Sequence, residues 1–171
     1  MTPWTDLWSA AVSWLKSHAA ARLPKLILGW LYPAKSLGKA VSIFGKEEGP
    51  HVYVNPDRPS FEIGPYEITF VNSLPFALSL TSLTGHVSVG YQEVAHLARS
   101  QCSRLDPQCA RTALQIPSVN LSDQQARHFR DLHGNLCQLS FQLTANLSGP
   151  TGDFQVTQAI NTHATIYRGA N

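Results

Sequence analysis

Hydrophobic and polar residues alternate along most of the chain after Pro50, which is the period of a half-buried β-strand. Pro, Gly and Asn residues typical of turns interrupt the alternation. The pattern predicts strands at residues 51–55, 61–64, 66–72, 76–82, 86–91, 112–116, 136–143 and 154–167. So many short strands separated by turns favour two packed antiparallel layers, with Ser, Thr and Gln on the solvated faces.

One helix is predicted among the late strands. Ser122 and Gln125 match a capping box, in which each side chain can accept a hydrogen bond from the backbone N–H of the other residue. Apolar Ala126 and Phe129 follow at helical spacing, and Gly134 is a typical stop. We therefore expect a helix over roughly residues 123–133.

The first 46 residues have a helical period instead. Thr2 and Pro3 are typical of a helix start, and apolar residues then recur every three or four positions. Pro24 would interrupt this helix, and a second apolar run over residues 26–32 ends at Pro33. We expect residues 1–46 to form an amphipathic helical segment and residues 47–171 to form a β domain, with a linker near residues 45–50.

Charge divides at the same boundary. Residues 1–46 hold six basic residues and one acidic residue, whereas residues 47–171 hold seven basic and ten acidic residues. The first part also holds all four Trp of the chain, and Trp near apolar residues flanked by Lys and Arg is a composition typical of a helix that lies among lipid headgroups. No run of about 18 apolar residues is present, so we expect no ordinary membrane-spanning helix. The net charge of +2 gives no reason to expect nucleic acid as a partner.

The sequence therefore predicts a peripheral membrane protein whose N-terminal segment docks on an anionic lipid surface and presents the β domain. The residues expected to make this contact are Trp4, Leu7, Trp8, Leu15, Lys16, Arg22, Lys25, Trp30, Lys35 and Lys39. The same surface would suit a structural subunit docked into a protein assembly, or packing against the chain's own β domain. A mitochondrial presequence and a shallow hairpin bent at Pro24 and Pro33 are further interpretations of this segment.

The region around residues 71–87 carries a family resemblance. A strand ending in Asn72 is followed by Pro75, an alternating run from Phe76, and Gly85 before the next strand. This order resembles the water-stress and hypersensitive-response domain of late-embryogenesis-abundant proteins, in which one late helix also precedes two long strands. Over residues 60–168 the resemblance implies an immunoglobulin- or fibronectin-like sandwich, a membrane tether just upstream, and a protective or binding role without catalysis. Here two residues separate the Asn and the Pro, which are adjacent in the family.

No motif for catalysis is present in the sequence, which lacks a nucleophile elbow, a phosphate loop, a dinucleotide fingerprint and a zincin motif. His128 and His133 are five positions apart, whereas metal-binding helices use spacings of three or four. We therefore expect no enzymatic activity, no metal and no cofactor. The most Arg-rich part of the β domain, expected to be a solvated loop, carries Arg99, Arg104 and Arg111.

The cysteines and the glycosylation sequons allow a third interpretation of the protein's function. Cys102 and Cys109 flank a polar turn and are candidates for a small disulfide loop in an oxidising compartment, whereas Cys137 alternates with apolar residues and is expected to be a buried thiol. Asn120 and Asn146 begin sequons and are candidate glycosylation sites. Together these features would fit a secreted or lumenal recognition domain.

Overall fold

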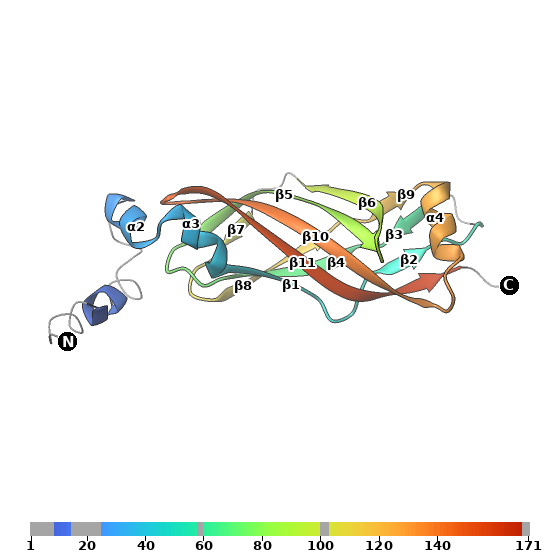
Figure 1. Cartoon of the computed structure of the whole chain (residues 1–171), viewed down its shortest axis with the longest axis horizontal. Coiled ribbons are helices and arrows are strands. Elements are labelled where there is room, and N and C mark those ends of the chain that lie inside the picture. Colours follow the sequence, from blue (N-terminus) through green and yellow to red (C-terminus); the bar gives the residue numbers. More distant parts are fainter. Residues whose placement is uncertain (1–8, 15–24, 58–59, 100–102, 169–171) are drawn as a thin grey trace.

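The chain folds mostly as β-structure with a few short helices, in a computed structural model that describes residues 9–14, 25–57, 60–99 and 103–168 (Figure 1). The smaller sheet is antiparallel and has three strands. In sheet order these are β1 (Val41–Gly45), β4 (Tyr66–Asn72) and β8 (Ala110–Ile116).

The larger sheet has eight strands. In sheet order they are β6 (Gln92–Arg99), β5 (Leu78–Val89), β10 (Leu136–Gly149), β11 (Gly152–Tyr167), β2 (His51–Tyr53), β3 (Phe61–Ile63) and β9 (Val119–Leu121), and β7 (Ser103–Leu105) pairs with β5. The β11–β2 pair is parallel and the other pairs are antiparallel. The two end strands, β6 and β9, come close to each other, so this sheet is nearly closed like a barrel.

Helices lie at the two ends of the molecule (Figure 1). One end carries α2 (Lys25–Leu31), α3 (Ala34–Leu37) and the 3-10 turn η2 (Gly38–Ala40), and the other carries α4 (Asp123–Arg130). The predicted capping box of α4 is confirmed: Gln125 N donates to Ser122 Oγ at 3.3 Å and Ser122 N donates to Gln125 Oε1 at 2.7 Å. Residues 9–14 are also helical.

β10 and β11 form one long hairpin along the molecule (Figure 1). Its register runs from Leu136↔Thr165 to Gly149↔Gly152, so only two residues turn the chain. Gly152 has φ +121°, a backbone conformation that glycine adopts at no steric cost. Buried and solvent-facing residues alternate along both strands, as the period-two pattern predicts.

A single strand, β5, replaces the two strands predicted at residues 76–82 and 86–91. Gly85 lies inside it, opposite Leu143 of β10. A Cβ at this position would stand 2.2 Å from the carbonyl oxygen of Gln142. The glycine therefore marks a close approach of two paired strands and does not end the strand.

The hydrophobic core lies between the two sheets. Tyr66 of β4 stacks on Phe141 of β10, with ring centroids 5.0 Å apart and planes inclined by 21°. Both rings are buried, as are Ile43 of β1 and Phe70 of β4. These contacts join the sheets through apolar and aromatic side chains, the main stabilising contribution in such a fold.

The β-structure starts earlier than the sequence indicates. β1 lies inside the segment expected to be helical through residue 46, and pairs with β4 from Val41↔Asn72 to Gly45↔Ile68. Its buried Val41 and Ile43 alternate with more exposed Ser42 and Phe44, which is a strand pattern. The helical part thus ends at Ala40, and the β domain includes residues 41–46.

Candidate functional site: an exposed apolar helix face and a cleft at the sheet seam

Helix α2 packs on the β domain through one side only. Leu28 and Leu31 are buried, and the ring of Tyr32, just after the helix, meets Phe76 edge-on at 5.4 Å between centroids. Burial also raises the pKa of the Tyr32 phenol above its ordinary value of 10.0. This side therefore attaches the helix to the end of the sheets.

The adjoining side of α2 is apolar as well, yet it faces solvent. Ile27 is 44% exposed and Trp30 is 69% exposed. An exposed Trp beside an exposed Ile on one short helix is uncommon on a monomer surface and is typical of a contact surface. Lys25, Lys35 and Lys39 lie in α2 or in the two short helical elements that follow it, and residues 25–46 hold no acidic residue.

The predicted docking residues divide into two groups. Trp30 lies exposed on α2, Lys25 begins α2, Lys35 lies in α3, and Lys39 is exposed in η2. The remaining ones lie outside the described residues: Trp4, Leu7, Trp8, Leu15, Lys16 and Arg22. Trp14, within the helical residues 9–14, is 61% exposed. Sequence reasoning did not single out Ile27, because an apolar run such as residues 26–32 does not show which side will pack.

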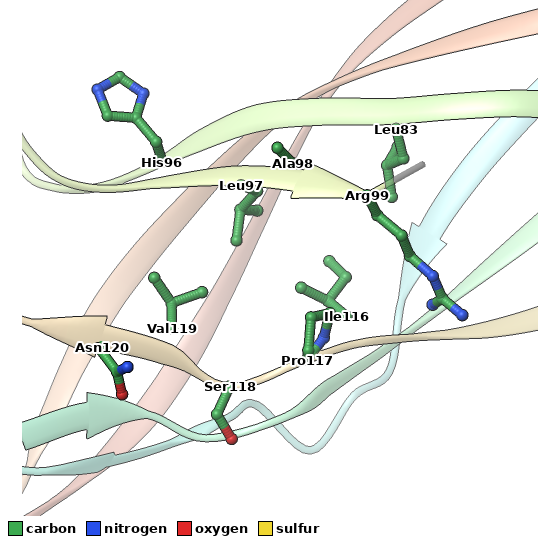
Figure 2. Close-up of a pocket in the computed structure, with 10 residues that line it drawn as sticks. All are labelled: Leu83, His96, Leu97, Ala98, Arg99, Ile116, Pro117, Ser118, Val119 and Asn120. Atoms are coloured by element: carbon green, nitrogen blue, oxygen red, sulfur yellow. The ribbon is translucent and has the colours of Figure 1, made fainter. Parts of the chain in front are cut away.

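A second feature is a cleft of about 200 Å³, lined by apolar and some polar side chains, at the seam where β6 and β9 approach. Figure 2 shows Leu97 and Val119 pointing toward each other across it, with Ile116 beside them. The His96 ring points away from the cleft, and Arg99 Nη1 donates to the carbonyl oxygen of Gln115. The lining thus pairs no nucleophile with a base, and its chemistry suits the burial of a small apolar group. The alternation of residues did not predict β6, so this cleft could not be expected from the sequence.

The arginines expected on one loop lie on three strands instead. Arg99 ends β6, Arg104 lies in β7 and Arg111 lies in β8. Arg104 Nε is 2.9 Å from Asp106 Oδ1 in an exposed ion pair. The expectation of a single Arg-rich loop was wrong, because the polar turn that was visible in the sequence is short and strands flank it on both sides.

The thiols differ in environment. Cys109 is exposed, and it follows Gln108 in a turn where both residues have positive φ. Cys137 is buried, as predicted; burial raises the pKa of its thiol and the charge of Arg168 lowers it in part. Cys102 lies outside the described residues, so its disulfide with Cys109 stays a prediction.

The two sequons lie on strands. Asn120 is exposed on the end strand β9 and also lines the seam cleft. Asn146 lies in β10, between β5 and β11, and its Nδ2 donates to Ser82 Oγ at 2.7 Å. A glycan on Asn146 would first have to break that hydrogen bond, so Asn120 is the more accessible of the two acceptors.

The described histidines lie on several strands of the large sheet, in α4 and in the turn after it. His86 of β5 is opposite His96 of β6, and His96 Nε2 is 2.8 Å from Glu93 Oε1. His163 of β11 is opposite Gln138 of β10, and β10 lies between the strands that carry His86 and His163. Within the described parts of the chain, no group of three His, Cys, Asp or Glu residues is arranged to hold a metal ion. Nor is any described helix long and apolar enough to cross a membrane.

Comparison with known proteins shows likeness of fold. A protein of Arabidopsis thaliana, solved in solution, is 17% identical with a TM-score of 0.51, covering 74% of this chain and 83% of its own. A protein described as a candidate late embryogenesis abundant protein is 10% identical, with a TM-score of 0.46 and coverage of 86% and 91%. A protein of Archaeoglobus fulgidus is 12% identical, with a TM-score of 0.47 and coverage of 73% and 94%. The sequence matches no protein-family model and no curated protein.

Proposed function

We propose that this protein is a non-enzymatic, peripheral membrane protein that docks on an anionic lipid surface through its N-terminal helices and presents its β domain. One observation carries the proposal: Leu28 of α2 packs in the core of the β domain and Leu31 is buried, while Ile27 and Trp30 of the same helix stay in solvent. A helix that served only the core would turn its apolar residues inward.

The chemistry of α2 and its surroundings supports a lipid surface in particular. A Trp ring combines a large apolar area with a polar N–H, which suits the boundary between headgroups and acyl chains. Burial of an Ile or Trp side chain contributes about 1.5–3 kcal/mol, and each Lys near an anionic surface adds about 1 kcal/mol. Lys25, Lys35 and Lys39 lie in a stretch of the chain, residues 25–46, that holds no acidic residue, so no acidic residue of that stretch offsets their attraction to phosphate groups.

The β domain, we further propose, is an immunoglobulin- or fibronectin-like sandwich of the water-stress and hypersensitive-response type. The element order supports this, because α4 precedes the two final long strands β10 and β11. Asn72, which stands where that family has its Asn, is buried at the end of β4 and hydrogen-bonds the loop that follows. A binding role without catalysis fits a fold whose seam cleft is lined by apolar and some polar side chains.

The test is flotation of the full chain with vesicles of phosphatidylcholine and a minor share of phosphatidylserine. We expect the protein to float with these vesicles at low salt, and less so at high salt because salt screens the lysines. Trp30→Ala with Ile27→Ala should lower the bound fraction about tenfold. Tyr91→Ala is the matched control, since Tyr91 is a fully exposed aromatic residue in the β5–β6 turn and should leave binding unchanged.

Equal flotation of wild type and the Ile27/Trp30 variant would contradict the proposal. A chain that ignores vesicles but stays in a fixed-stoichiometry complex with another protein after detergent and salt washes would favour the second candidate function, a structural subunit of a protein assembly. The exposed face of α2 would then be a protein interface, and the same double substitution should release the chain from the complex.

A further inference from the structure

The three longest strands share an outer face with almost no charge. β5, β10 and β11 contain 12, 14 and 16 residues, and Asp153 near the β10–β11 turn is the one charged residue among them. An average protein has about 25% charged residues, and charged residues normally concentrate on solvent-facing positions. The centre of the large sheet therefore presents a long surface, the neutral face, that holds no Lys, Arg or Glu, one Asp at its end, and the histidines His86 and His163.

Hydroxyl and amide side chains cover this neutral face in register across the strands. Three such rows are Ser88–Ser140–Asn161, Thr84–Thr144–Thr157 and Ser82–Asn146–Gln155. Neighbouring side chains are hydrogen-bonded: Thr144 Oγ1 is 3.0 Å from Thr157 Oγ1, and Asn146 Nδ2 is 2.7 Å from Ser82 Oγ. These contacts hold the side chains in place at the spacing of paired strands, about 4.8 Å. Each hydroxyl or amide can both donate and accept, so capacity for an external partner is left over.

An aromatic cluster ends the neutral face. Tyr167 of β11 is 45% exposed and lies on the same side of its strand as Asn161 and His163. Its ring stacks on Tyr53 of β2, with centroids 5.3 Å apart and planes inclined by 21°. The ring of His51 meets Tyr167 edge-on at 5.3 Å. The cluster adds apolar ring surface to an otherwise hydrogen-bonding face, and each ring has a polar atom at its edge.

We propose that this neutral face binds an uncharged polysaccharide chain. Sugar hydroxyls donate and accept in the same way as the Ser, Thr, Asn and Gln side chains of the face, and the apolar C–H side of a sugar ring packs on aromatic surface such as that of Tyr167. Anionic polymers bind through Lys and Arg, which β5, β10 and β11 lack. The face thus complements a neutral, hydroxyl-rich partner in charge as well as in hydrogen bonding. This proposal does not depend on membrane docking.

The experiment is native gel electrophoresis of the full chain in gels that contain a polysaccharide. The neutral probes are xylan, a mixed-linkage glucan, dextran and hydroxyethylcellulose, and polygalacturonate is the charged probe. We expect at least one neutral polymer to slow the wild-type chain. Gln142→Lys, which places a charge at the centre of the face, and Tyr167→Ala should each weaken this retardation about tenfold.

Gln115→Lys is the matched control, because Gln115 is also an exposed strand glutamine but lies on β8 of the small sheet. The added charge changes the mobility of this variant, and a polymer-free gel measures that change. After correction for it, the polysaccharide should slow Gln115→Lys as much as it slows the wild-type chain. Thermal unfolding of each variant separates loss of binding from loss of fold. The proposal is overturned if no neutral polymer slows the wild-type chain, if polygalacturonate alone does, or if Gln142→Lys and Gln115→Lys behave alike.

Discussion

The side-chain oxygen of Gln158 accepts a hydrogen bond from the backbone N–H of Ile43 at 2.9 Å, across a sequence separation of 115 residues. Gln158 lies on β11 of the large sheet and Ile43 on β1 of the small one. The bond satisfies a partly buried N–H of β1, whose pairing with β4 occupies one of its edges. It is therefore a polar link between the two sheets beside their apolar core.

Removal of this link should destabilise the fold. Gln158→Ala leaves the Ile43 N–H without its acceptor, and an unsatisfied partly buried donor costs about 1–3 kcal/mol in free energy of unfolding. Urea unfolding followed by circular dichroism measures the change. Gln155→Ala, an exposed glutamine on the same strand, should change stability by less than about 0.5 kcal/mol. If both variants unfold at the wild-type urea concentration, the link does not contribute to stability.

Asn72 should be harder to replace, because it makes three hydrogen bonds in a site that is 1% exposed. Its Nδ2 donates to the carbonyl oxygens of Phe76 and Leu105 at 2.9 and 3.3 Å, and its Oδ1 accepts from Leu74 N at 3.0 Å. Asn72→Leu leaves these backbone groups unpaired, and we expect a loss of about 3 kcal/mol or more.

The same urea titration measures this loss, with Asn161→Leu on the exposed face of β11 as the control. A cost for Asn72→Leu no larger than that of the control would show that water replaces the amide group without penalty.

Two glycine substitutions should move stability in opposite directions. In Gly85→Ala the new Cβ would lie 2.2 Å from Gln142 O and 3.1 Å from Leu143 Cα, both backbone atoms, so we expect a loss of about 2 kcal/mol or more. Gly29→Ala adds a Cβ on α2 that meets nothing within 4 Å, and should raise stability by about 0.5–1 kcal/mol through helix propensity. Thermal denaturation measures the melting temperature of both variants. If both melt above the wild type, or both below it, this account is wrong.

The thiol of Cys137 should be unreactive and should link stability to alkaline pH. Burial raises its pKa in the folded chain above the ordinary value of 9.0. A raised pKa means that the unfolded chain releases the proton first, so stability is fully present below about pH 9 and declines as pH rises through the folded pKa. Cys137→Val should have a shallower decline above that pH.

Thiol labelling provides the independent measurement. In a Cys102→Ser background, Ellman's reagent at mildly alkaline pH should modify exposed Cys109 rapidly and Cys137 only at the rate of unfolding. Immediate modification of two thiols in the folded chain would contradict the burial of Cys137.

The sequence predicted those elements in which local signals and tertiary contacts agree. Ser122 and Gln125 sit side by side at the start of α4, so their capping box depends on no distant residue. The strands β4, β10 and β11 have one face in the core and one in solvent, and their residues alternate accordingly. The mostly β architecture agrees with the resemblance to the water-stress domain. The assignment of the β domain as an immunoglobulin- or fibronectin-like sandwich of that type stays a proposal.

The strand β6 was missed because a register shift disrupts its pattern. Val94 and Ala95 are both buried although they are neighbours, and the pairing with β5 shifts between Val87 and Ser88. Such a bulge sends two successive side chains to one side, which removes the period-two signal. The seam cleft depends on β6 and β9 meeting, so nothing local to either strand could indicate it.

The exposed face of α2 was equally invisible to sequence patterning. Residues 26–32 are apolar nearly throughout, so periodicity does not separate Leu28 and Leu31, which pack, from Ile27 and Trp30, which do not. The packed side is set by contacts with distant parts of the chain: Leu28 joins the core of the β domain, and Tyr32 meets Phe76, which lies just before β5 and more than 40 residues away. The sequence therefore predicted this segment as a docking region, but only the structure shows which of its side chains are buried and which are exposed.

The β10–β11 hairpin runs from α2 at one end of the molecule to α4 at the other, a span of about 50 Å for the 16 residues of β11 (Figure 1). Leu28 of α2 packs in the core of the β domain, and Tyr32 just after the helix contacts Phe76. A partner that binds α2 would therefore hold the protein by one end, with α4 at the far end of the long strands (Figure 1).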